Sequence, residues 1–99
     1  MKGINMIKII AKILVKDDAI EQFQKEAGEL IEESRAEEGN VSYTLNQNVD
    51  DPCEHVVMEI WKDDEAIQKH NASEHFTGIF PKLAALAKED PVVDLYKEI

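Results

Sequence analysis

The hydrophobic period changes from two residues to about 3.6 near Asp17, and this change constrains the fold more than any other feature of the sequence. Before it, apolar residues take every second position, which is the period of a half-buried strand. These residues are Ile7, Ile9, Ala11, Ile13 and Val15. After it, apolar residues trace one helical face to about residue 36. These residues are Ile20, Phe23, Ala27, Leu30 and Ile31. The chain is therefore predicted to begin with a strand and a long amphipathic helix.

Both ends of this helix carry sequence signals. Asp17 or Asp18 is expected to cap its start, because Glu21 follows Asp18 by three residues, as in a capping box. Gly39 and Asn40 are expected to end it, since glycine accommodates the left-handed conformation found beyond a helix terminus.

Two further alternating segments, residues 41–46 and 55–61, are predicted to pair as an antiparallel hairpin. In the second segment, four residues share one face. They are His55, Val57, Glu59 and Trp61. Because side chains alternate along a strand, Glu59 and the only tryptophan of the chain should lie side by side.

The last third of the chain is predicted to form two helical stretches and a final strand. Asp63 is expected to cap a short helix, and Ser73 to start the second stretch. Apolar residues of that stretch are Phe76, Ile79, Phe80, Leu83 and Leu86. Pro81 predicts a bend near residues 77–80, because an interior proline removes a backbone donor. Residues 92–99 are typical of a strand.

This order of elements, strand, helix, strand, strand, helix, strand, indicates an α+β fold of the ferredoxin-like βαββαβ type, with helices on one face of an antiparallel sheet. A length of 99 residues allows a single domain. The strands are apolar on both faces; Ile10 and Leu14, for example, accompany Ile9 and Ile13. The uncovered face is therefore expected to bury itself against a second copy of the chain.

Charge and composition exclude several functions. The chain has 11 basic and 21 acidic residues, a net charge of −10, which argues against nucleic-acid and membrane-surface partners. Its apolar runs are shorter than the roughly 20 residues that span a bilayer. A single cysteine, Cys53, fits a reducing compartment, and we expect a cytoplasmic protein.

His70 is a candidate general base. Ala66 and Ile67 place it on the apolar face of its helix, turned toward the sheet, and an imidazole titrates near neutral pH. The simpler interpretation is a histidine at the edge of the core that is bonded to a backbone carbonyl.

Glu59 and His75 are further candidates. Burial beside Trp61 would raise the pKa of Glu59 and suit it to acid–base work or to orienting a histidine; alternatively, it is a solvated strand residue. His75 follows His70 by five residues, so the two rings converge only if the helix breaks near residues 72–73. Two zinc-binding histidines on one helix are usually four residues apart, so we predict no metal site. The acidic pairs at 32–33 and 37–38 are expected to be exposed.

Residues 59–66, followed by His70 and by the segment 73–76, resemble the core motif of the antibiotic biosynthesis monooxygenase superfamily, close to its quinol monooxygenase branch. Residues 37–40 before Tyr43 resemble the helix-to-strand junction of that family. The resemblance covers nearly the whole chain. It implies one domain over residues 1–99 and a dimeric α+β barrel.

The resemblance also implies a reaction without metal, flavin or haem, in which a small phenolic or quinol-like aromatic substrate is deprotonated and its anion reacts with dioxygen. His70 would be the base and Glu59 would orient it or balance its charge. Tyr43, Trp61 and Phe76 would contact the ring of the substrate, and His75 would bind a substrate oxygen. A haem-degrading function is not expected, because His70 and Phe80 stand where such relatives carry tryptophan and histidine.

Two other functions remain open from the sequence. One is an isomerase of a small phosphorylated ketone, related to enzymes that process a quorum signal. The other is a non-catalytic dimeric module that binds a ligand. Basic side chains in the pocket would favour the isomerase, and an aromatic pocket with few polar groups would favour the oxygenase.

We predict a homodimer in solution, because strands that are apolar on both faces need a second cover. Sedimentation at micromolar concentration should give twice the mass of the chain. A monomer under these conditions would contradict the prediction.

Overall fold

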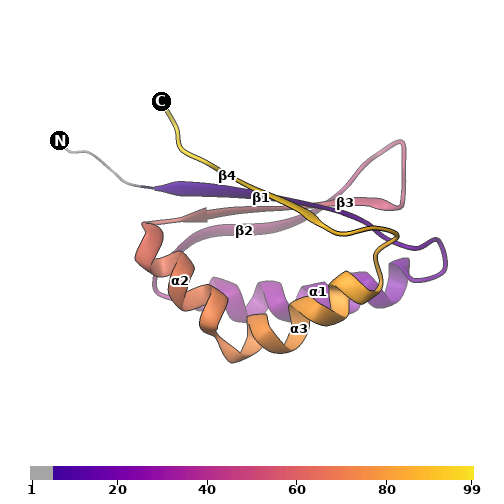
Figure 1. Cartoon of the computed structure of the whole chain (residues 1–99), viewed down its shortest axis with the longest axis horizontal. Helices are drawn as coiled ribbons and strands as arrows, with labels where there is room; N and C mark the ends of the chain where they lie inside the picture. Colours follow the sequence, from indigo (N-terminus) through magenta and orange to yellow (C-terminus); the bar gives the residue numbers. More distant parts are fainter. Residues whose placement is uncertain (1–5) are drawn as a thin grey trace.

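The computed structural model describes residues 6–99, which form four strands and three helices (Figure 1). The strands are β1 (Ile7–Leu14), β2 (Asn40–Gln47), β3 (Glu54–Trp61) and β4 (Val92–Tyr96). The helices are α1 (Ile20–Arg35), α2 (Asp64–Ala72) and α3 (Glu74–Ala85). The strands form one antiparallel sheet in the order β2-β3-β1-β4. The predicted ferredoxin-like α+β fold is confirmed.

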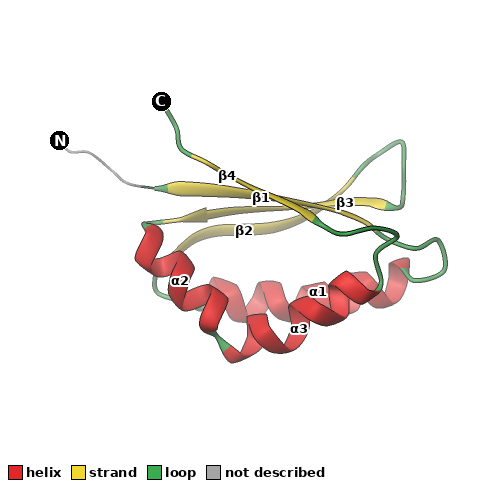
Figure 2. Cartoon of the chain, viewed as in Figure 1, coloured by secondary structure: helices red, strands yellow, loops and turns green. Residues whose placement is uncertain are grey.

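All three helices lie on the same side of the sheet (Figure 2). The predicted alternation explains this arrangement, because the residues of β1 and β3 that are buried against the helices occupy every second position. Within residues 6–99, no element covers the opposite face of the sheet. On that side, Met58 is 46% exposed, so the face predicted to meet a second copy is open in the single chain.

The core consists of two clusters of buried side chains. The first contains Ile9, Ala11, Ile31, Tyr43, Val57, Trp61, Ala66 and Ile67. The second contains Ile13, Val15, Ala19, Phe23, Ala27, Leu30 and Leu83. The first cluster packs α2 against the sheet. The second packs α1 and α3 against the other end of β1.

The predicted caps of α1 are wrong at both ends. The helix begins after Ala19, and no side chain caps it. Asp17 instead accepts a hydrogen bond from the Cys53 thiol at 3.0 Å and pairs with Lys88 at 2.8 Å, so its carboxylate links two loops to the chain before α1. At the other end, α1 stops at Arg35, well before Gly39.

Position 39 requires glycine because there is no room for a side chain, and not because of its backbone conformation. Among residues 6–99, no glycine has a positive φ. A Cβ atom at Gly39 would collide with the side chain of Ala66 in α2. The close approach lets the turn after α1 lie directly on α2.

The predicted helix starts at Asp63 and Ser73 are confirmed. Asp63 accepts a hydrogen bond from the Ala66 amide at 2.8 Å, and the Ser73 hydroxyl accepts one from the Phe76 amide at 3.2 Å. Ser73 has an extended backbone and therefore separates α2 from α3. The helix break that the two histidines require is present.

Pro81 does not interrupt α3, which runs from Glu74 to Ala85 with the proline inside it. Thr77 and Pro81 are both exposed, so water can satisfy the Thr77 carbonyl that lacks a donor at Pro81. The last strand is shorter than predicted, ending at Tyr96.

In the described part of the chain, no helix is long and apolar enough to cross a membrane.

We predict that Gly39→Ala lowers the free energy of unfolding by about 1–3 kcal/mol, because the added methyl group forces the turn away from Ala66. Urea denaturation would measure the change. Gly28→Ala is the matched control, since no atom lies within 4 Å of the Cβ position of this helical glycine. It should leave stability unchanged or raise it by up to about 1 kcal/mol. Equal stability of the two variants would contradict the role assigned to Gly39.

Candidate active site

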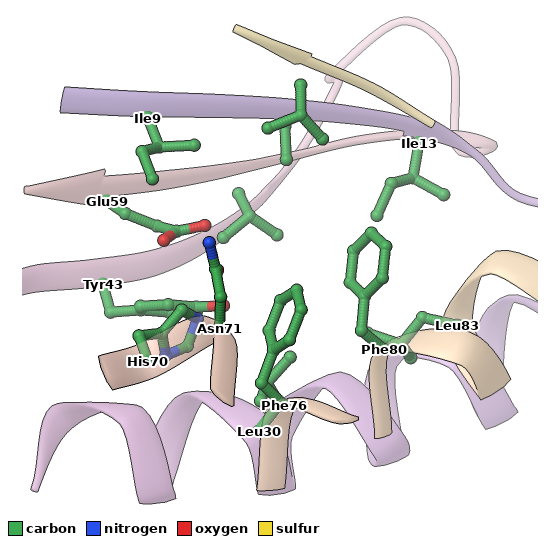
Figure 3. Close-up of a pocket in the computed structure, with 13 residues that line it drawn as sticks. Ile9, Ile13, Leu30, Tyr43, Glu59, His70, Asn71, Phe76, Phe80 and Leu83 are labelled. Atoms are coloured by element: carbon green, nitrogen blue, oxygen red, sulfur yellow. The ribbon is translucent and has the colours of Figure 1, made fainter. Parts of the chain in front are cut away.

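A pocket of about 100 Å³ lies between the sheet and the helices (Figure 3). Among residues 6–99, its lining is largely aliphatic and aromatic, with four polar side chains and neither lysine nor arginine. The polar residues are Tyr43, Glu59, His70 and Asn71. The apolar residues are Ile9, Ala11, Ile13, Leu30, Val57, Phe76, Phe80, Leu83 and Val93. An aromatic ring fits such surroundings better than a strongly charged ligand does.

The pocket opens beside β4. Val93 pairs with Ala11 and Leu95 pairs with Ile9, so both side chains lie on the helix side of the sheet. They nevertheless stay about half exposed, 48% and 54%. Val93 therefore lies at the open side of the pocket.

His70 is buried in the pocket wall. The apolar face of α2 carries it toward the sheet, as predicted, and only 1% of the residue is exposed. Its ring centroid lies 4.5 Å from that of Trp61 and 4.9 Å from that of Phe76. Burial lowers the pKa of His70, while the hydrogen bond and charge of Glu37 act in the opposite direction. The neutral imidazole is therefore favoured at neutral pH.

The hydrogen bonds of His70 determine which nitrogen is basic. Nδ1 lies 2.7 Å from Oε2 of Glu37, and a carboxylate can only accept, so Nδ1 carries the ring proton. Nε2 then has a lone pair, and within residues 6–99 this atom has no hydrogen-bond partner. Glu37 does not line the pocket, and among residues 6–99 Nε2 is the nitrogen of His70 that stays unpaired.

Glu37 is the residue that sequence analysis missed. We expected it on an exposed face, but α1 ends at Arg35 and the following turn brings Glu37 over α2, where it is 17% exposed. The same Oε2 atom lies 2.7 Å from Nε2 of His75 in α3. Glu37 is 33 residues from His70 in sequence, so no local periodicity could have revealed the contact.

Glu59 is buried at the pocket, and its carboxyl group bonds to Trp61, whereas the carboxylate that bonds to His70 is that of Glu37. Oε1 of Glu59 accepts a hydrogen bond from Nε1 of Trp61 at 2.8 Å, as the shared strand face suggested. Burial raises the pKa of Glu59 to about 7; the bond from Trp61 opposes this shift and the charge of Glu37 adds to it. Glu59 is therefore a group that can exchange a proton near neutral pH.

Tyr43 stands opposite Glu59 across the β2–β3 pair. Burial raises the pKa of Tyr43, with a smaller contribution from the charge of Glu59, so the phenol stays protonated at neutral pH. Its ring meets the His70 ring edge-on at 5.7 Å. Tyr43 thus supplies an aromatic surface beside the base.

The structure brings four of the six predicted site residues into the pocket lining. These are His70, Glu59, Tyr43 and Phe76. Trp61 and His75 do not line it: Trp61 is fully buried behind His70, and His75 bonds to Glu37 outside the pocket.

Asn71 and Phe80 line the pocket, although sequence analysis did not propose either as a site residue. Asn71 extends toward the carboxyl group of Glu59 (Figure 3), and Phe80 stacks on Phe76 with ring centroids 5.1 Å apart. The apolar periodicity of α3 marked Phe80 as an inward residue. Asn71 had no sequence signal of a pocket residue apart from its position next to His70.

Comparison with known proteins gives consistent results. The family model for antibiotic biosynthesis monooxygenases matches residues 6–82. The protein named "Putative monooxygenase YcnE" from Bacillus subtilis is 43% identical over 77 residues, which cover 78% of this chain and 81% of that protein.

The fold of this chain matches that of solved structures over almost its full length. A conserved protein from Methanosarcina mazei superposes with a TM-score of 0.94 at 30% identity, covering 97% of this chain and 95% of that one. A structure described as an antibiotic biosynthesis monooxygenase superposes with a TM-score of 0.90 at 33% identity, covering 94% and 98%.

We predict that Glu59→Gln raises stability at pH 8 but not at pH 4. The pKa of Glu59 is about 7 in the fold against an ordinary 4.5, so the folded state binds more protons between these values and wild-type stability falls as the pH rises through them. Above pH 7 the penalty is on the order of 3 kcal/mol, and glutamine avoids it while still accepting the bond from Trp61.

Urea denaturation at the two pH values would measure the effect of Glu59→Gln. Glu33→Gln on the exposed face of α1 is the control, with no pH-dependent difference expected. A Glu59→Gln variant that is no more stable than wild type at pH 8 would show that the carboxyl group is not desolvated.

Proposed function

Because the chain belongs to the antibiotic biosynthesis monooxygenase family, we propose that it is a cofactor-independent monooxygenase that oxidises a small phenolic or quinol-like aromatic compound with dioxygen. The observation that carries the proposal is the state of His70. This buried imidazole donates to Glu37 through Nδ1 and has a free Nε2, in a pocket lined mainly by apolar groups. Such a group is suited to remove a proton from a hydroxyl group.

In the proposed reaction, Nε2 of His70 accepts the proton of the phenol. Glu37 stabilises the imidazolium that forms, because its carboxylate already accepts from Nδ1 at 2.7 Å. The substrate anion transfers an electron to dioxygen, and the two radicals combine at a ring carbon to give a peroxide. Loss of water from the peroxide leaves a new carbonyl group. The substrate supplies the electrons, and the protein supplies the base and a dry pocket.

Glu59 is proposed as the second proton carrier. With a pKa of about 7, it is partly protonated at neutral pH and can deliver a proton to the departing oxygen. Asn71, whose side chain extends toward Glu59, is placed to bind a substrate oxygen, the role that sequence analysis gave to His75. Phe76 and Tyr43 would pack on the ring.

Pocket size limits the substrate class. A volume of about 100 Å³ is smaller than the ~150 Å³ of an engineered cavity that binds benzene. One aromatic ring therefore fits with part of it in the opening beside Val93. A single-ring quinol is favoured over a large polycyclic one.

The alternative functions have less support. An isomerase of a phosphorylated ketone needs cationic donors for the phosphate, and the described part of the chain contributes no lysine or arginine to the pocket lining. A module that only binds a ligand has no need for a buried imidazole held in one tautomer. We also propose that the protein acts as a homodimer formed through the uncovered sheet face, on which Met58 is partly exposed.

We predict that His70→Ala lowers the turnover of an oxidisable substrate on the order of 10²-fold or more, because the base is lost. Oxygen consumption with a panel of dihydroxy-aromatic compounds would identify the substrate and measure the loss. Full activity of this folded variant would contradict the assignment of His70 as the base.

The Glu37→Gln variant should retain more activity than His70→Ala and should show a shifted pH profile of kcat/KM. Glu37 raises the pKa of His70, so its neutralisation should lower that pKa and move the acid limb of kcat/KM to lower pH. Glu38→Gln is the matched control, since this neighbour is exposed and paired with Lys62 at the surface. An unchanged limb in Glu37→Gln would show that Glu37 does not act on the base.

A further inference from the structure

We propose that Glu37, His70 and His75 form a binding site for one divalent cation of the zinc class, and that the bound cation blocks the base of the pocket. The three potential ligand atoms lie within 4.8 Å of one another. They are Oε2 of Glu37, Nδ1 of His70 and Nε2 of His75. The metal site stands on its own geometry; its effect on turnover rests on the proposed function.

The donor set fits zinc. Two imidazole nitrogens and one carboxylate oxygen are a ligand set that Zn²⁺ binds in proteins, with a fourth position open to water. Magnesium and calcium prefer sites made of oxygen ligands only. The site should therefore discriminate between these classes of cation.

A spacing of five residues keeps His70 and His75 apart only if both lie on one continuous helix. In such a helix, residues five apart differ by roughly 140° in direction. Here Ser73 interrupts the helix with an extended backbone, so His70 lies in the last turn of α2 and His75 lies in the first turn of α3. Their ring centroids are 5.9 Å apart, and the turn after α1 adds the third ligand.

The cluster needs little rearrangement to take a metal ion. Donor atoms about 2.1 Å from a tetrahedral zinc ion are about 3.4 Å from each other. Oε2 of Glu37 lies 2.7 Å from each nitrogen, so this carboxylate must withdraw slightly. Glu37 lies in a turn, and its side chain and that of His75 are 17% and 16% exposed. The outer side of the cluster is thus partly exposed to solvent, and from there an ion and a water ligand would enter.

Metal binding has a direct consequence for His70. In the metal-free protein Nδ1 carries the ring proton and Nε2 has the lone pair. A metal ion on Nδ1 needs that lone pair, so the ring proton must move to Nε2, with no change in oxidation state. An Nε2 that carries a proton cannot accept one from a substrate. The bound cation therefore acts as an inhibitor from outside the pocket.

The binding test uses the metal alone. Calorimetric titration of chelator-treated protein with Zn²⁺ should show one equivalent per chain, and Mg²⁺ should show none. His75→Ala and Glu37→Gln should weaken zinc binding at least about tenfold, because each removes a ligand. Glu38→Gln, which changes the exposed neighbour of Glu37, should bind like wild type.

A second candidate ligand group, the Cys53 thiol with Asp17, is tested in the same way. Zinc binding that survives in His75→Ala and disappears in Cys53→Ser would overturn the proposal. So would the absence of saturable zinc binding. Co²⁺ in place of zinc should give the visible absorption of a tetrahedral nitrogen and oxygen site, and the His75→Ala variant should lose it.

The inhibition test needs the substrate found by oxygen consumption. Stoichiometric zinc should suppress turnover of wild type, whereas the residual activity of His75→Ala should be insensitive to it. Stoichiometric binding without suppression would overturn the inhibitory role. If the metal-free protein oxidises no phenol at all, the proposed function fails and the calorimetric result for the metal site still stands.

Discussion

One oxygen atom, Oε2 of Glu37, holds the site together, because it lies 2.7 Å from imidazole nitrogens on two different helices. This contact joins the turn after α1 to the end of α2 and the start of α3. It also gives His70 a defined tautomer, with a free nitrogen for the pocket. The absence of a side chain at Gly39 lets the turn approach α2, and the break at Ser73 brings His75 near.

The pocket favours neutral forms of its acid and its base. Burial raises the pKa of Glu59 to about 7 and lowers that of His70, so at neutral pH Glu59 is partly protonated and the imidazole is mainly neutral. A neutral phenol and dioxygen can enter such a site without displacing bound counterions. A phosphorylated substrate would have to enter without a cationic partner in the lining.

The errors of sequence analysis have a common cause. One prediction took a local period to continue: Glu37 was placed on an exposed helical face, whereas α1 ends at Arg35 and Glu37 lies in the turn that follows. The hydrogen bond of Glu59 goes to Trp61, two residues along the same strand, and the carboxylate that bonds to His70 comes from Glu37. The contact of Glu59 with Trp61 follows from the alternation of side chains along a strand. The contact of Glu37 with His70 joins residues 33 apart in sequence, and no local period predicts it.

By itself, the sequence determined the order of elements, the inward face of β1, the pairing of Glu59 with Trp61 on one face of β3, the caps at Asp63 and Ser73 and the burial of His70, because each depends on neighbours within a few residues. Only the tertiary structure decided which carboxylate meets His70, that Trp61 lies behind the pocket wall, and that Asn71 lines the pocket. These contacts depend on where turns place side chains from separate elements. Packing, and not hydrophobic period, sets those positions.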